Sequence, residues 1–248
     1  MKKIIAIGGG EIGRPGFSIE TTKIDKEVIK LSGKKNPKLL FVPTATNDSQ
    51  SYIDVITKQY GKRLGCIVDV LFLIKEKPNK KEIRNKILKS DIIYVGGGNT
   101  LKMMNVWKKY GVEKILKEAH KKGIVLTGLS AGSICWFKWG NSDSRRFYNP
   151  KADLIKVSGL SLINALHCPH YDFEKDRKSD LKKMMKKTSG VAIAIDNCCA
   201  IEVIDDKYKI IDSKSSANAY KVYWKNNEYY KEIIKKEGLK PINILLKK

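Results

Sequence analysis

The strongest constraint on the fold is an alternation, repeated along the N-terminal half, between short apolar runs and longer amphipathic runs. The apolar runs are typical of buried strands and cover residues 4–7, 39–42, 66–73, 91–95 and 124–129. Strands that are apolar throughout and separated by helices indicate a parallel sheet covered on both faces. The alternation therefore predicts a doubly wound α/β fold.

Amphipathic runs fill the spaces between these strands. Apolar residues three and four positions apart predict helices over residues 24–31, 79–88, 100–107 and 112–121, and a short helix over residues 131–137. Gly33 follows the first helix as a C-cap, and Asp48 or Ser49 caps a further helix with one apolar face. That face carries Tyr52, Ile53, Ile56 and Tyr60.

The pattern changes after about residue 150, where strand-like runs dominate. They cover residues 154–163, 165–168, 191–195, 200–204, 208–211 and 219–224, with one helix near residues 174–186. No linker rich in Pro, Gly or Ser separates the two halves. We therefore expect residues 1–248 to form one α/β domain, in which the C-terminal strands extend a mostly parallel sheet or add a hairpin layer.

The chain carries 49 Lys and Arg against 26 Asp and Glu, a net charge of +23. Such a charge suggests an anionic partner such as nucleic acid or a membrane surface. Nucleic-acid sites usually rely on Arg, however, and the lysines here are spread over every predicted helix. The arginines are Arg14, Arg63, Arg84, Arg145, Arg146 and Arg177. The charge therefore indicates a solvated, lysine-rich surface, and we expect neither nucleic acid nor a membrane as partner.

Cysteine usage and hydropathy bear on the compartment. Cys66, Cys135, Cys168, Cys198 and Cys199 form no CxxC pair, and no His stands at zinc-like spacing from two of them. No apolar run reaches about 18 residues, and the N-terminal apolar stretch is too short for a signal peptide. These features predict a protein of the reducing cytoplasm.

The first glycine-rich loop follows the first predicted strand. Gly8, Gly10 and Gly13 fit the G-x-G-x-x-G pattern of dinucleotide sites, but that motif should open directly into a helix. Here Pro15 follows, and helical periodicity begins only near residue 24. We therefore interpret this segment as a flexible loop at the edge of the sheet where α/β proteins bind ligands.

The second glycine-rich loop, Gly96-Gly97-Gly98-Asn99-Thr100, lies between a predicted strand and a predicted helix and lacks the Lys of a P-loop. Three glycines allow close backbone approach and leave N–H groups available to an anion or an oxyanion. The alternative is a tight turn capped by Asn99 or Thr100, which explains one glycine more easily than three. We favour the binding function.

The sharpest local signal is Gly128-Leu129-Ser130-Ala131-Gly132, which fits the G-x-S-x-G nucleophile elbow. It lies between a predicted strand and a short predicted helix, as that motif requires. The strained turn needs small neighbours, exposes the Ser130 hydroxyl above the sheet and leaves the Ala131 N–H free for a tetrahedral oxyanion. An ordinary helix N-cap is the alternative role for Ser130.

A serine nucleophile needs a base, and the chain has three histidines. His120 lies in a Lys-rich predicted helix and is interpreted as solvated. His167 and His170 flank a Cys-Pro pair, and either can serve as the base. His170 stands past the strand end, where a loop can bring it to the elbow, whereas His167 is more typical of a satisfied core histidine.

A third group must orient the imidazole. Asp143 follows the predicted elbow helix, while Asp172 and Glu174 lie close to His170 in the chain. Local helix capping is the alternative role for Asp172 and Glu174. The residues alone leave the choice open.

Three blocks in this order resemble the peptidase E family of serine peptidases, the aspartyl dipeptidases, whose relatives include cyanophycinase. The blocks are VGGGNT at residues 95–100, GLSAGS at 128–133 and PHY at 169–171, and the resemblance runs from residue 3 to about residue 203. It implies a class I glutamine-amidotransferase-like fold, which is a flavodoxin-like α/β sheet. Amidotransferases of that class use a Cys nucleophile, so the Ser of this elbow argues against glutamine hydrolysis.

For the catalytic groups, the resemblance implies Ser130 as nucleophile and His170 as base. It further implies an oxyanion hole formed by the N–H of Gly97 or Gly98 together with that of Ala131.

For the remaining groups, the resemblance points to Asp143 as the triad acid. Asp172 is the alternative, because His170-Tyr171-Asp172 is similar to the His-x-Glu arrangement of class I amidotransferases. Asn99 and Arg177 are the candidate substrate-binding residues, the latter because an acidic side chain needs a cation. A solvated helix position is the alternative for Arg177.

The resemblance thus implies a cytoplasmic serine peptidase that cleaves small peptides, N-terminal-aspartyl dipeptides among them, through an acyl-enzyme and with no metal or organic cofactor. The alternatives are an esterase of a non-peptide substrate and a catalytically inactive basic binding protein. A homodimer is a further expectation, based only on how common dimers are. The positive field would then draw small acidic peptides toward Ser130.

Overall fold

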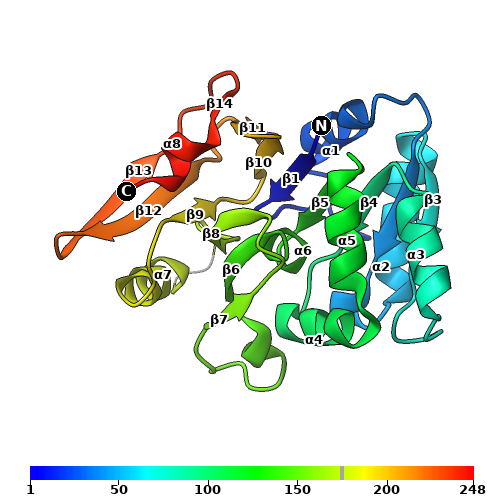
Figure 1. The fold of residues 1–248 in the computed structure, drawn as a ribbon, viewed down its shortest axis with the longest axis horizontal. Coiled ribbons are helices and arrows are strands. Elements are labelled where there is room, and N and C mark those ends of the chain that lie inside the picture. Colours follow the sequence, from blue (N-terminus) through cyan, green and yellow to red (C-terminus); the bar gives the residue numbers. More distant parts are fainter. Residues whose placement is uncertain (174–175) are drawn as a thin grey trace.

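The computed structural model describes residues 1–173 and 176–248 and places their strands in two sheets (Figure 1). The first sheet has the order β14-β11-β10-β1-β5-β4-β2-β3. Its strands are β1 (Lys3–Ile7), β2 (Lys38–Val42), β3 (Ile67–Val70), β4 (Ile92–Val95), β5 (Val125–Leu129), β10 (Cys199–Ile204), β11 (Lys207–Asp212) and β14 (Lys240–Pro241). From β1 to β3 all neighbours are parallel, whereas β10, β11 and β14 add antiparallel pairs beyond β1. The predicted α/β fold is therefore present.

Helices cover both faces of the parallel strands. The helices of the N-terminal half are α1 (Thr22–Ser32), α2 (Gln50–Ile56), α3 (Lys80–Leu88), α4 (Thr100–Tyr110) and α5 (Val112–Lys121). Successive strand residues point to opposite faces, so Ile5 and Ile7 join the core cluster of α1 and α2. Ile4 and Ala6 join the cluster that contains α3, α4 and α5. This two-faced burial explains why the strands are apolar throughout.

Local signals placed most helix ends correctly. Gly33 ends α1 in the left-handed conformation with φ 70°. Asn79 begins α3 with a capping box, in which its side chain accepts from the backbone of Lys81 and Glu82. The helix α2 continues as a π-helical turn over Thr57–Arg63, and β3 is shorter than the run predicted over residues 66–73.

The C-terminal half forms most of the second sheet, with the order β13-β12-β9-β8-β6-β7. Its strands are β6 (Phe137–Ser142), β7 (Ile155–Ser158), β8 (Ile163–Cys168), β9 (Ala192–Ile195), β12 (Ala219–Lys225) and β13 (Glu228–Ile233). The helix α7 (Arg177–Lys186) packs on one face through Leu181 and Met185, and α8 (Ile242–Leu246) lies near the C-terminus. The strands predicted after residue 150 therefore do both things expected of them, since some extend the first sheet and others form a new layer.

Two expectations for this half were wrong. The helix predicted over residues 131–137 ends early as α6 (Ala131–Ile134), and the strand β6 begins at Phe137. The strand predicted over residues 154–163 is broken between β7 and β8. There the backbone turns at Ser161, with φ 58°, and bonds to residues 135–137 instead of continuing the ladder. Tertiary pairing with the elbow segment thus overrides the local strand propensity.

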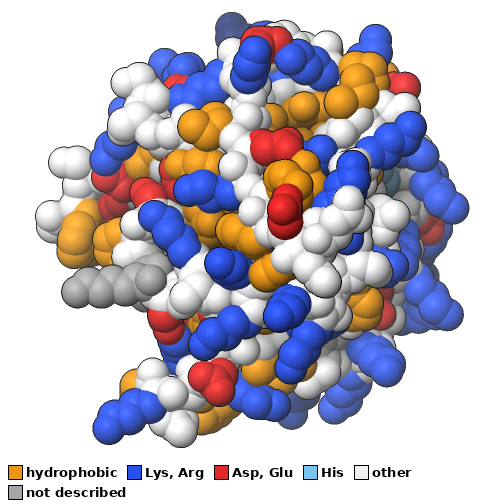
Figure 2. Space-filling model, turned by 90° about the vertical axis from the view of Figure 1, so that its left-hand side faces the viewer, with side chains coloured by type: hydrophobic (Ala, Val, Ile, Leu, Met, Phe, Trp, Pro, Cys, Tyr) orange, Lys and Arg blue, Asp and Glu red, His pale blue; other side chains and the backbone are white. Residues whose placement is uncertain are grey.

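Surface charge follows the sequence expectation. On the face shown in Figure 2, Lys and Arg side chains are scattered among hydrophobic, neutral and acidic ones and do not gather into one block. This distribution supports a solvated lysine-rich surface. Within the described ranges, no helix combines the length and apolar character needed to cross a membrane.

Candidate active site

Ser130 occupies a strained turn between β5 and α6. Its φ of 58° and ψ of −114° lie outside the regions that L-residues ordinarily adopt, and its N–H donates to the carbonyl of Ile7 at 3.2 Å. A Cβ at Gly132 would stand 2.0 Å from the carbonyl oxygen of Val95, so only glycine fits there. The strained backbone predicted for this motif is therefore present.

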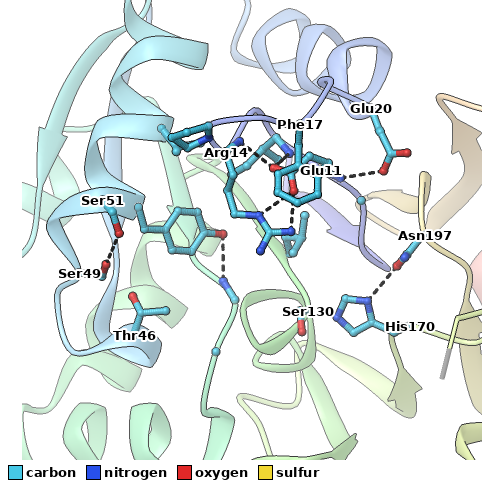
Figure 3. Close-up of a pocket in the computed structure, with 18 of the residues that line it drawn as sticks. Glu11, Arg14, Phe17, Glu20, Thr46, Ser49, Ser51, Ser130, His170 and Asn197 are labelled. Carbon is cyan, nitrogen blue, oxygen red and sulfur yellow. Dashed lines mark hydrogen bonds and ion pairs between the residues drawn. The ribbon is translucent and has the colours of Figure 1, made fainter.

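His170 lies beside Ser130, on the loop that follows β8 (Figure 3). Its Nδ1 lies 2.9 Å from Oδ1 of Asn197, which follows β9. Because an amide oxygen can only accept, Nδ1 carries the proton and Nε2 is left as a base. The backbone N–H of Asn197 donates to Asp172 Oδ1 at 2.9 Å. The site therefore runs from Ser130 through His170 and Asn197 to Asp172, and we call this series of residues the row.

The first glycine-rich loop packs directly behind this row. A Cβ at Gly9 would stand 1.9 Å from Asn197 Oδ1 and 2.4 Å from His170 Nδ1. The loop backbone also accepts the N–H of Cys198 at the carbonyl of Gly9, at 2.9 Å. The glycines after β1 therefore let the backbone approach the imidazole–amide pair closely, which accounts for the cluster without a dinucleotide.

The second glycine-rich loop lies on the other side of Ser130. A Cβ at Gly97 would be 3.3 Å from the Cβ of Ser130, so the two residues are neighbours. The Gly97 N–H donates to the hydroxyl of Tyr52 at 3.2 Å, and burial raises the pKa of Tyr52 to about 12. In the part of the chain that the structure describes, the N–H groups of Gly98 and Ala131 have no hydrogen-bond acceptor. These two groups are the ones left for an oxyanion.

A pocket of about 780 Å³ opens above Ser130 (Figure 3). Its lining comes from the loop after β1, the start of α2, the second glycine-rich loop, the elbow and the loop after β8, and it includes Glu11, Arg14, Phe17, Glu20, Tyr52, Leu129, Ser130, His170, Phe173 and Asn197. Burial tends to raise the pKa of Glu11, but the hydrogen bonds from Arg14 and Gly13 outweigh it and lower that pKa. The carboxylate of Glu11 is therefore charged.

His167 lies inside the core, as predicted. It is fully buried and stacks on Phe137 with ring centroids 4.5 Å apart. Its Nδ1 donates to the carbonyl of Ile193 at 3.0 Å, and its Nε2 lies 2.8 Å from the Ser133 hydroxyl, which also donates to the carbonyl of Ser130 at 2.7 Å. Burial lowers the pKa of His167 to about 3. The expectation for His120 was wrong, because that residue is partly buried and burial lowers its pKa to about 4.

Three sequence-predicted site residues lie elsewhere. Asn99 is buried, caps α4 by accepting from Lys102 N, and donates to the carbonyl of Ser144. Arg177 is buried rather than solvated and donates to the carbonyl of Asn141 at 2.8 Å, with Asp143 4.0 Å from its guanidinium. The described lining of the pocket includes none of Asn99, Asp143 and Arg177. Glu174 lies outside the described residues.

Asn197 is the site residue that the sequence reasoning missed. The signal was available, because Asp196 and Asn197 come directly after the strand predicted over residues 191–195. Polar residues at the carboxyl end of a buried strand are candidates for a site in α/β proteins. The carboxylates predicted for the orienting role lie near the elbow and near His170 in the chain, whereas the group that contacts His170 Nδ1 is the amide of Asn197.

No metal centre is apparent in the described part of the chain, where no three His, Cys, Asp or Glu side chains cluster in a way that could hold an ion.

The model of peptidase family S51 matches residues 4–211 of this chain. The chain is 36% identical over 232 residues to the uncharacterized peptidase YgaJ of Bacillus subtilis (strain 168), covering 92% of this chain and 95% of that protein. It is 28% identical over 159 residues to the uncharacterized peptidase Lmo0363 of Listeria monocytogenes serovar 1/2a, covering 59% of this chain and 74% of that protein.

Two solved structures share the fold. A crystal structure of a peptidase from an acI-B1 Actinobacterium has a TM-score of 0.72 at 18% identity and covers 97% of each chain. A putative peptidase E protein from Listeria monocytogenes EGD-e has a TM-score of 0.64 at 21% identity, covering 86% of this chain and 98% of that one. These likenesses bear on the fold, which agrees with a flavodoxin-like arrangement.

Proposed function

The chain belongs to peptidase family S51, the peptidase E family, and from that premise we propose that it is a serine peptidase that cleaves small peptides at Ser130. One observation carries the proposal. Ser130 stands in a strained turn at the end of β5, beside His170 and in the same pocket as the second glycine-rich loop. That combination of nucleophile, base and backbone donors is what acyl transfer requires.

The reaction follows from the tautomer of His170. Nε2 removes the proton of Ser130 Oγ as that oxygen attacks the scissile carbonyl, and the resulting imidazolium then protonates the leaving amine. The N–H groups of Gly98 and Ala131 stabilise the oxyanion, while Gly97 holds the loop through Tyr52. In the second half of the reaction, Nε2 removes a proton from a water molecule as the water attacks the acyl-enzyme. The imidazolium then returns a proton to Ser130 Oγ as the acid product is released.

Asn197 takes the orienting role in this proposal. Its amide oxygen fixes His170 in the reactive tautomer, as a neutral Asn does in Cys-His-Asn proteases. A neutral amide stabilises the positive charge of the imidazolium less than a carboxylate would. Asp172 accepts the backbone N–H of Asn197 and so helps to hold that residue in place.

The size of the pocket supports small peptides as substrates. A volume of about 780 Å³ is that of a small-molecule site and suits a ligand of a few residues. N-terminal-aspartyl dipeptides remain within this proposal. Since Arg177 is buried against Asn141, an acidic substrate would have to meet a different cation.

The test is Ser130→Ala assayed on the full chain against a panel of dipeptides and a simple ester. We expect the variant to lose about three orders of magnitude or more in kcat, because the nucleophile is gone, with an unchanged circular dichroism spectrum. Ser161→Ala is the matched control, since Ser161 also has a φ of 58° but does not line the pocket.

Full activity of Ser130→Ala would refute the proposal. Hydrolysis of the ester without that of any peptide would instead make the protein an esterase, and hydrolysis of neither would support a binding role.

A further inference from the structure

Arg14 lies in the loop between β1 and α1, and its guanidinium points into the pocket above Ser130 (Figure 3). Its Nε donates to Glu11 Oε2 at 2.7 Å, and its Nη2 lies 2.6 Å from the same oxygen. The other oxygen of Glu11 accepts the N–H groups of Ile12, Gly13 and Arg14 at 3.0, 3.0 and 2.8 Å. Glu11 therefore fixes the position of both the loop backbone and the Arg14 side chain.

A second contact restrains the guanidinium from another side. Its central carbon lies 5.0 Å from the centroid of the Phe17 ring, within the range of a cation–π interaction. The Arg14 side chain is nevertheless 67% exposed. The side chain is thus held in place by Glu11 and Phe17 and is still open to the pocket.

Arg14 keeps donors for a ligand. A guanidinium has five N–H groups in a planar fork, and Glu11 engages only the edge formed by Nε and Nη2. Within residues 1–173 and 176–248, Nη1 has no hydrogen-bond acceptor. The planar fork matches the two oxygens of a carboxylate.

The charges of the pocket favour Arg14 as the anion receptor. Among the described residues that line the pocket, Arg14 is the only lysine or arginine. Among the described lining residues the two acids are already engaged, since Glu11 binds Arg14 and Glu20 binds Lys214 and the N–H of Glu11. Among these residues, an entering carboxylate therefore meets a fixed cation and no unpartnered carboxylate.

We propose that Arg14 is the specificity-determining residue of this site and receives a carboxylate of a small peptide substrate. The inference rests on the proposed function, because it places that carboxylate in the pocket of Ser130. Either the side chain of an acidic residue or the C-terminal carboxylate of a dipeptide presents the required chemistry. Preorganisation by Glu11 and Phe17 lowers the ordering cost of binding.

The test measures binding in a Ser130→Ala background, so that no peptide is consumed. Isothermal titration uses Asp-Leu, Leu-Leu and their C-terminal amides, which carry both carboxylates, one of them or neither. Arg14→Gln removes the cation, and Arg14→Lys keeps the charge without the fork. Arg84→Gln is the matched control, since Arg84 also pairs with a glutamate, Glu118, but lies outside the pocket.

We expect Arg14→Gln to weaken binding of carboxylate-bearing peptides by about tenfold or more, as for the loss of a charge-assisted hydrogen bond. Arg14→Lys should lose less, and Leu-Leu-amide should be unaffected by either change. A loss confined to Leu-Leu and Asp-Leu assigns the C-terminal carboxylate, whereas a loss with Asp-Leu-amide assigns the side chain. Arg84→Gln should leave all four peptides unchanged.

The proposal is overturned if Arg14→Gln affects Leu-Leu-amide as much as the others. It is also overturned if the Ser130→Ala protein binds no carboxylate-bearing peptide more tightly than Leu-Leu-amide. Failure of the proposed function looks different, because it appears as wild-type protein that hydrolyses no peptide in a Ser130-dependent way, whatever the binding pattern.

Discussion

The molecule contains two Ser–His pairs built from the same short segments, Ser130 with His170 and Ser133 with His167. Ser130 is the N-cap of α6 and Ser133 lies within that helix, while His167 lies in β8 and His170 just after it. Ser130 and His170 line the pocket, whereas Ser133 and His167 are buried. Burial therefore separates a pair suited to chemistry from a pair suited to packing.

The acceptors of the two imidazoles sharpen this contrast. His170 Nδ1 is bound by the side chain of Asn197, while His167 Nδ1 is bound by the backbone carbonyl of Ile193. Both arrangements leave Nε2 without a proton. What differs is access, because only the first Nε2 can meet a substrate. A basic nitrogen beside a serine hydroxyl is thus insufficient evidence for catalysis.

After the loss of Ser130 itself, the largest expected effect comes from removing the group that orients the pocket-lining pair. Asn197→Ala should lower kcat/KM for a peptide substrate by about 100-fold, because His170 loses its tautomer and orientation. Asp143→Ala should stay within about threefold of wild type, since Asp143 does not line the pocket. Steady-state kinetics on both variants decide the point, and the reverse order would return the orienting role to Asp143.

A smaller effect is the loss of stability at acidic pH that arises from His167 in the buried pair. Burial holds the pKa of His167 at about 3, against 6.5 in the unfolded chain, so below pH 6.5 only the unfolded state takes up the proton. Stability contributed by neutral His167 is therefore present above pH 6.5 and is lost as the pH falls toward 3. Between pH 7.5 and pH 5 the loss should be about 2 kcal/mol.

Urea unfolding of wild type and His167→Gln at these two pH values measures that loss. The variant should lose about 2 kcal/mol less than wild type on acidification. His120 shifts in the same direction for the same reason, but it is only partly buried, so water screens its share. Equal acid sensitivity in wild type and His167→Gln would show that His167 is not held neutral by burial.

The smallest effect is expected from Ser133→Ala. The change removes the hydroxyl that contacts both the Nε2 of His167 and the carbonyl of Ser130, which should cost about 1–2 kcal/mol of unfolding free energy. The kcat/KM should change by less than about threefold, because Ser133 does not line the pocket. A fall of about 100-fold at unchanged stability would contradict the contrast and move Ser133 into the catalytic machinery.

Much of this architecture could be predicted because its signals are local. Apolar runs, helical spacing, the cap at Gly33 and the G-x-S-x-G elbow each involve residues close together in the chain. The second sheet was harder to predict, since β6 begins where a helix was expected. Its strands are selected by pairing with distant segments, which local propensity does not report.

The sequence by itself determined the α/β class, the strained serine and the two candidate histidines, because these depend on short patterns and on residue identity. Only the tertiary structure decided the roles of the partners. It brought Asn197 and Arg14 to the pocket of Ser130 and buried Arg177, Asn99 and His167 elsewhere. The physical reason is that burial and hydrogen bonding between strand ends far apart in the chain are set by how the sheets and loops pack, which no single segment encodes.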